Sequence, residues 1–130
     1  MTRQNLLYIL LSLIVGVATL HTAASVFSLY WRLAWFDMLP HFFGGAFVAL
    51  GLFWLSFFSG YRGARHLPDS VSVFTLIFVG TLIVGVGWEV FEYLLGHIWS
   101  PEGYWLDTVT DLCVDMLGAL AVYFCIRHRL

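Results

Sequence analysis

The chain has 130 residues, of which 61% are hydrophobic and 11% are charged, and its formal net charge is −2. A soluble domain of this size needs a polar surface that this composition cannot supply. The six basic side chains are all arginines and are too few for a nucleic-acid-binding surface. The composition excludes both classes and indicates an integral membrane protein, whose main partner is the lipid bilayer.

Long apolar runs account for most of the chain. A membrane-spanning helix needs about 20 mostly apolar residues, and four such runs fit, joined by short polar loops. We therefore expect an all-α fold: a polytopic four-transmembrane-helix bundle that forms a single transmembrane domain over residues 1–130. The expected helices cover approximately residues 5–29, 36–58, 70–98 and 106–127.

The first apolar run follows Arg3 and ends near a cluster of small residues, Ala23 to Ser25. Cleavable signal peptides share this order of features, but their apolar region is usually only about 7–15 residues long. The run here is longer, so we expect the first helix to be retained, and cleavage stays open as the alternative.

Start signals precede the next two helices. Asp37 is a suitable cap or first-turn acid for the second run, and Pro40 lies in its first turn, where a missing N–H does no harm. Asp69 or Ser70 can cap the third run, which follows a polar loop with two glycines and two arginines. The fourth run begins after a shorter loop that contains proline and glycine.

The arginines orient the expected bundle. With four spans, the N-terminus, the second loop and the C-terminus lie on one side of the membrane, and only Arg32 lies on the other. By the positive-inside rule, the N- and C-termini should both be cytoplasmic. The arginines on the cytoplasmic side are Arg3, Arg62, Arg65, Arg127 and Arg129.

Ionisable side chains gather towards the opposite, outer ends of the expected helices. A rise of about 1.5 Å per residue places most of them about 5–15 Å below the outer surface. Within a helix they are spaced three or four residues apart, so each set shares one face. Gly44 and Gly45 follow His41 by three and four residues, Gly118 follows Asp115 by three, and small residues let membrane helices approach closely. We therefore expect the acids to converge inside the bundle.

The cost of burying these acids decides what must accompany them. An ionised side chain at membrane depth costs about 2.5–3.5 kcal/mol on insertion scales, and no arginine lies in the outer half of an expected helix. The acids must bind protons, bind a cation or face a water-filled pocket. Carboxylate oxygens suit Mg²⁺, Mn²⁺ or Ca²⁺, and added imidazole admits Zn²⁺ or Fe²⁺. We expect a divalent metal ion of open identity as cofactor, with ligands from His41, Glu89, Glu92, Asp111 and Asp115 and with Asp37, Asp107 and His21 as secondary candidates.

Three motifs carry a resemblance to a known family. They are Asp37-x-x-x-His41 with Gly44-Gly45, Trp88-Glu89-x-x-Glu92, and Trp105-x-Asp107-Thr108-x-x-Asp111-x-x-x-Asp115-x-x-Gly118. In these motifs the chain resembles the YjdF-like (DUF2238) bacterial inner-membrane proteins and, more faintly, the VanZ-like membrane proteins. The resemblance implies a multi-pass protein of the bacterial inner (cytoplasmic) membrane with a polar intramembrane site, and it names no reaction.

Three functions remain open at this stage. The first is a divalent-metal site with metal-assisted chemistry on a lipid or envelope substrate, in which the ion polarises an oxygen or activates water. The second is proton or ion handling, which needs a polar route that the apolar inner halves of the helices do not offer. The third is a non-enzymatic structural membrane subunit held together by protonated acids. The sequence does not decide whether the protein is an enzyme or whether it forms a homo-oligomer.

Overall fold

Helices make up the regular structure throughout the part of the chain that the computed structural model describes, residues 2–60, 70–96 and 103–127. Four spans are long and apolar enough to cross a membrane, the second of them formed by η1 and α3 together. The expected all-α fold with four membrane spans is confirmed. The elements are α1 (Arg3–Val26), α2 (Leu29–Arg32), η1 (Ala34–Asp37), α3 (Met38–Phe57), α4 (Ser70–Leu94) and α5 (Tyr104–Arg127).

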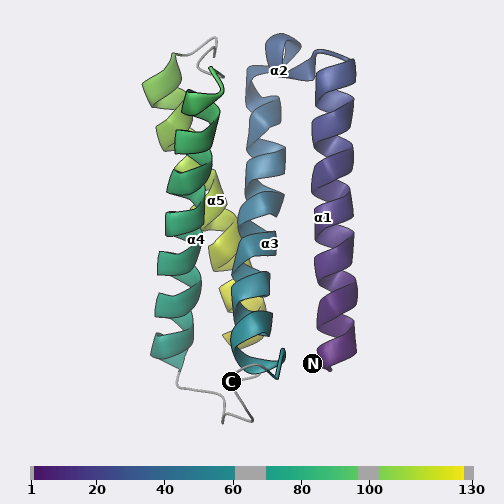
Figure 1. The fold of residues 1–130 in the computed structure, drawn as a ribbon, viewed down its shortest axis with the longest axis vertical. Coiled ribbons are helices and arrows are strands. Elements are labelled where there is room, and N and C mark those ends of the chain that lie inside the picture. The colour runs from purple at the N-terminus through teal and green to yellow at the C-terminus, as the bar shows by residue number, and fades with distance from the viewer. Residues whose placement is uncertain (1, 61–69, 97–102, 128–130) are drawn as a thin grey trace.

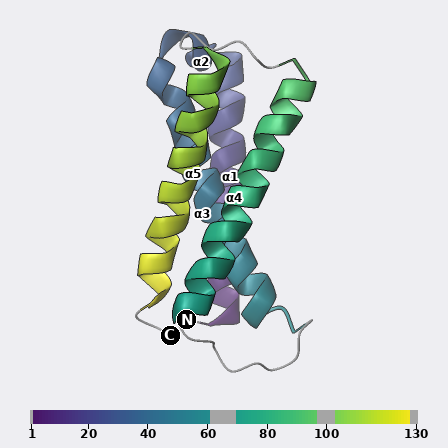
Figure 2. The same cartoon turned by 90° about the vertical axis from the view of Figure 1, so that its left-hand side faces the viewer.

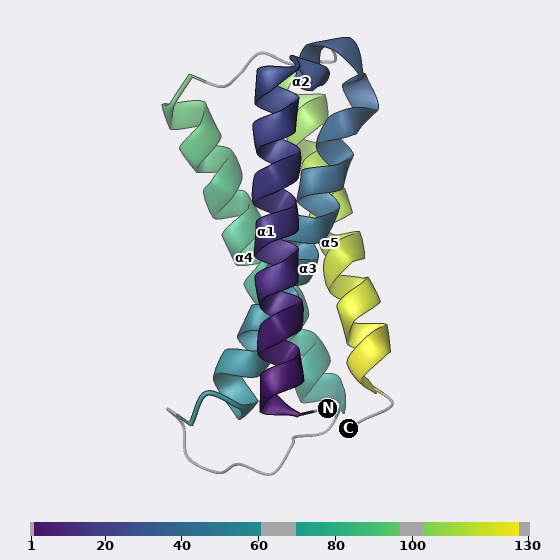
Figure 3. The same cartoon turned by 90° about the vertical axis from the view of Figure 1, so that its right-hand side faces the viewer.

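The helix α3 lies at the centre of the bundle and contacts α1, α4 and α5, whereas α1 packs chiefly on α3 (Figures 1 and 3). The start of α1 and the end of α5 lie at one end of the bundle, and α2 lies at the opposite end (Figure 1). Which of these ends is cytoplasmic stays a prediction. It rests partly on Arg62, Arg65 and Arg129, which lie outside the described residues.

Two helices end earlier than the sequence predicts. The first was expected to reach residue 29 but ends at Val26, because Ser28 adopts a left-handed backbone (φ 54°) that a continuing helix cannot contain. The third was expected to reach residue 98 but ends at Leu94, followed by Gly96 at φ 78°. Glycine has no Cβ and enters this region without strain, so it is a common helix stop. Residues 97 and 98 lie outside the described residues.

The bundle divides into an apolar half and a polar half. The apolar half is a buried core at the end where α1 begins, drawn from all four long helices. The polar half lies towards α2 and contains the buried side chains of His41, Glu89, Asp111 and Asp115. The core residues are Leu6, Leu10, Ala49, Leu50, Phe53, Val73, Ile77, Ala119 and Ile126.

Two glycines allow α3 and α5 to cross in close contact. A Cβ built on Gly45 of α3 would overlap the backbone of Asp115, and one on Gly118 of α5 would overlap the backbone of Phe42 and Ala46. Small residues at a crossing bring two membrane helices to backbone contact, where van der Waals packing is strongest. This crossing lies in the polar half, so it also sets how closely the acids of α5 approach α3.

We expect Gly45→Ala to destabilise the protein and Gly44→Ala to leave it as stable or slightly more stable. The methyl group at Gly45 must push α5 away, and overpacking of this kind costs about 1–3 kcal/mol. A Cβ at Gly44 meets nothing within 4 Å, and alanine is the better helix former by about 1 kcal/mol. Thermal unfolding of both variants in detergent, followed by circular dichroism, measures the difference. Equal melting temperatures would contradict the close crossing.

Candidate metal centre

His41 is the central side chain of the polar half. It lies one turn inside α3, four residues after Asp37 at the end of η1, and this spacing puts the two side chains on one helix face. Pro40 does not interrupt the helix here, because it lies in the first turn, where its missing N–H has no helical partner. Only 8% of His41 is exposed, so its ring is almost entirely enclosed by the bundle.

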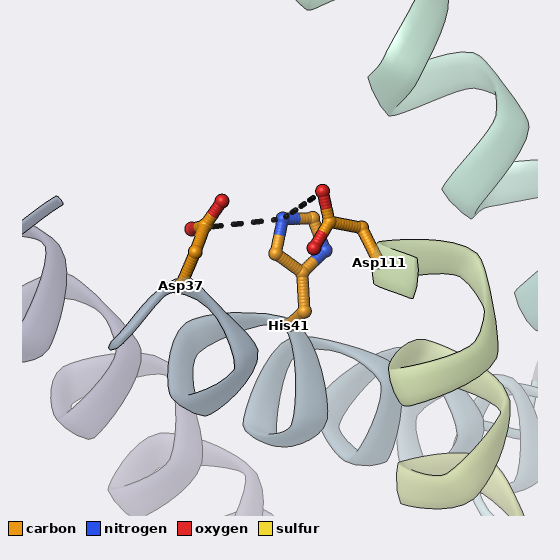
Figure 4. A group of neighbouring side chains, drawn as sticks. All are labelled: Asp37, His41 and Asp111. Atoms are coloured by element: carbon orange, nitrogen blue, oxygen red, sulfur yellow. Dashed lines mark ion pairs between the residues drawn. The ribbon is translucent and has the colours of Figure 1, made fainter. Parts of the chain in front are cut away.

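One ring nitrogen of His41 faces two carboxylates from different elements (Figure 4). The distance from Nε2 to Oδ1 of Asp37 is 3.9 Å, and the distance from Nε2 to Oδ2 of Asp111, on α5, is 3.8 Å. One ligand-type atom from each of these three residues lies within 4.8 Å of the other two. Oxygen and nitrogen ligands at about 2.0–2.2 Å from a metal ion stand about 3–4 Å apart, so these three side chains are close enough that they could hold a metal ion after small adjustments.

The other ring nitrogen of His41 faces Asp115. Its Nδ1 lies 3.4 Å from Oδ1 of Asp115, which is also buried. In the neutral tautomer that carries its proton on Nδ1, this carboxylate would accept the Nδ1–H and leave the Nε2 lone pair directed at Asp37 and Asp111, an arrangement common to metal-ligating histidines. Asp111 and Asp115 are one turn apart on α5, and the crossing at Gly45 and Gly118 brings both of them within reach of the ring.

Negative charge dominates this cluster. Among the described residues, every ion pair involves His41, and two of the arginines lie over aromatic rings instead: Arg3 over Trp54 and Arg127 over Phe124. Buried carboxylates without counter-charge carry a large desolvation cost. The arrangement therefore favours binding of a cation or of protons.

The remaining expected ligands lie around this centre rather than in it. Glu89 of α4 is buried beside Thr108 of α5, and its Oε1 has no hydrogen-bond partner among the described residues. Glu92 and Asp107 are half-buried. Within the described residues, the group with the spacing of metal ligands contains Asp37, a secondary candidate in the sequence, and does not include Glu89, Glu92 or Asp115.

His21 lies apart, on α1. It is exposed, and its Nδ1 lies 2.9 Å from the hydroxyl of Tyr30 in α2. Sequence reasoning did not single out Tyr30, because it lies nine residues away beyond a break in the helix, where helical spacing gives no signal. Burial, Asp37 and Glu92 together raise the pKa of Tyr30 to about 12. The phenol is thus partly buried and lies near two acidic side chains at the end of the bundle where α2 lies.

This fold and cluster define a small α-helical membrane protein with four candidate spans and a carboxylate–histidine group in one half of the bundle. A comparison with protein families matches residues 2–130 to the family described as "Predicted membrane protein (DUF2238)". The chain therefore belongs to the DUF2238 family, as the motifs around Asp37, Glu89 and Asp111 indicated. No curated protein and no solved structure matches the chain. The likeness to VanZ-like proteins stays a prediction.

We expect the stability of the wild-type protein to fall as the pH rises from about 10 to about 12, and this fall to be smaller in Tyr30→Phe. The native state holds the Tyr30 proton more tightly than the unfolded chain, whose tyrosines titrate near pH 10. Between the two pKa values the unfolded state binds fewer protons, so the free energy of unfolding decreases with pH. Chemical unfolding of both proteins across this range measures the effect. An identical pH dependence would place Tyr30 in water, away from Asp37 and Glu92.

Proposed function

We propose that the protein binds a divalent metal ion through Asp37, His41 and Asp111 and that Asp115 positions the imidazole. The observation that carries the proposal is the two-sided environment of His41: Nε2 between two carboxylates and Nδ1 against a third. A structural role for protonated acids needs no imidazole aligned in this way. A buried histidine with one nitrogen fixed by a carboxylate and the other free to ligate is typical of metal sites.

The types of ligand atom narrow the choice of metal ion. One imidazole and two carboxylates suit Zn²⁺, Fe²⁺ and Mn²⁺ better than Ca²⁺, which prefers oxygen ligands alone. Three protein ligands leave coordination positions for water or a substrate oxygen, as in catalytic sites. The Asp37 side chain is 34% exposed, whereas that of Asp111 is 4% exposed. The open side of the site is therefore the side of Asp37, towards the end of the bundle.

This position suits chemistry on a molecule at the membrane surface. A bound ion would polarise a phosphoryl or carbonyl oxygen or activate water, and the substrate class we propose is a lipid head group or envelope precursor. The positive-inside rule puts the site in the outer half of a bacterial inner-membrane protein with cytoplasmic termini. Ion transport is a weaker proposal, because the core of the other half is closed by apolar side chains such as Leu50, Phe53 and Ile77.

Metal analysis tests the binding site directly. We expect detergent-purified protein incubated with Mn²⁺ or Zn²⁺ to retain bound metal after dialysis. Asp111→Asn and His41→Gln should each weaken this site at least a hundredfold, because each removes one of three ligands. Elemental analysis by mass spectrometry gives the metal content per chain.

His21→Gln is the matched control. It makes the same substitution at a histidine that is exposed and hydrogen-bonded to Tyr30, so its metal content should equal that of the wild type. Absence of metal from the wild type would overturn the proposal. An equal loss of bound metal in the His21 and His41 variants would mean that His41 is not a specific ligand.

A second measurement tests the chemistry. We expect the Zn²⁺-loaded protein in phospholipid nanodiscs to convert head-group phosphodiesters into new phosphorus species, which phosphorus NMR resolves with time. The His41→Gln protein in the same nanodiscs should leave the lipid spectrum unchanged. Unchanged spectra in both samples would contradict a reaction on phospholipid head groups.

A further inference from the structure

Two sets of hydroxyl groups in the bundle differ in their hydrogen bonding. Five hydroxyls, on Ser12, Thr19, Thr22, Ser59 and Thr75, donate to the carbonyl four residues earlier, at distances of 2.5–3.0 Å. This is the usual way in which a helix satisfies a hydroxyl that faces lipid. The buried hydroxyl of Thr81 has no such bond, nor any other hydrogen-bond partner in the described part of the chain, and the buried hydroxyl of Thr108 faces the carboxyl group of Glu89 instead of a carbonyl.

Thr108 lies beside Glu89, whose Oε1 is buried without a hydrogen-bond partner among the described residues. Only 5% of Glu89 is exposed. A helical side chain covers the turn before its own Cα, so Glu89 lies over Gly85. Since α4 and α5 run in opposite directions (Figure 2), the side chain of Asp115 leans towards the same level from the other side.

Gly85 leaves the space in which these groups meet. A Cβ at this position would lie 2.8 Å from Oδ2 of Asp115, so any larger residue would displace that carboxylate. The other oxygen of Asp115, Oδ1, faces His41. Asp115 therefore presents one oxygen to the α3 side and the other to the seam between α4 and α5, where Glu89 and Thr108 lie.

The charges of the buried carboxylates indicate what kind of ligand the seam would bind. In the proposed metal centre, one divalent ion balances the two charges of Asp37 and Asp111, with His41 neutral. Asp115 and Glu89 then remain as two buried negative charges with no described cation beside them. Two carboxylates and a hydroxyl offer oxygen alone, which is the ligand type of hard divalent cations.

We propose that Glu89, Oδ2 of Asp115 and Oγ1 of Thr108 form a second cation site, specific for a hard divalent ion such as Mg²⁺ or Mn²⁺. The site rests on the proposed function in one respect, since Asp115 also contacts the histidine of the first centre. Two neighbouring ions would allow one to hold a phosphoryl oxygen while the other activates the attacking water, as in two-metal phosphoryl chemistry.

Equilibrium dialysis of the purified full-length protein against Mn²⁺, followed by elemental analysis, tests this inference. We expect two Mn²⁺ per chain in the wild type and one in Glu89→Gln, which keeps the shape of the side chain and removes its charge. His41→Gln should also bind one, held at the second site. Thr108→Val should bind the second ion at least tenfold more weakly.

Thr81→Val is the matched control for Thr108→Val. It removes a buried hydroxyl on the same face of α4 that lies one turn before Gly85 and two turns before Glu89, away from the proposed second site. It should keep two ions at wild-type affinity. If Glu89→Gln does not fold, the two threonine variants decide the question, because neither changes a charge.

The possible outcomes separate the two proposals. One ion in the wild type, lost in His41→Gln and kept in Glu89→Gln, would overturn the second site and leave the first. One ion lost in both variants would show a single shared site and also overturn the inference. No ion in the wild type would overturn both proposals.

Discussion

The polar half of this protein depends on the backbone contact between α3 and α5. Gly45 and Gly118 leave no room for a Cβ at the crossing, so the two helices meet without intervening side chains. Asp111 and Asp115 can then reach His41 across the interface at 3.8 Å and 3.4 Å. A wider crossing would leave the same residues in the same helices but would separate the ring from its carboxylates. The close packing at the two glycines therefore also sets the distances between His41 and its carboxylates.

A second constraint comes from the price of buried charge in a membrane. Carboxylates at this depth are tolerated only when protons, cations or water offset their desolvation. The apolar half, where Leu6, Leu50 and Ile77 pack closely, holds the helices together independently of that balance. This division lets the polar half carry a cluster that would be destabilising on its own. A site that is costly when empty binds its cation strongly, because binding removes the cost.

The sequence predicted the four membrane spans, because they follow from a local pattern, whereas the full set of site residues stays a prediction. Hydropathy located the four spans, and spacing showed that Asp37 and His41 share one face. Spacing does not say which face of one helix meets which face of another, so the division of the acids between His41 and the seam at Glu89 could not be predicted. His21 illustrates the same limit: its helix packs chiefly on α3, and its partner Tyr30 lies beyond a left-handed turn at Ser28.

The order of the elements along the chain has a consequence for how the protein is made. Asp37 and His41 lie in the second membrane span, whereas Asp111 and Asp115 lie in the last. During synthesis, the second span enters the bilayer before its partner has been translated, and its histidine then has no carboxylate from α5. The cluster is completed only when α5 inserts and packs on α3. Assembly of the cluster thus waits for α5, and a chain whose translation stops before α5 would insert without it.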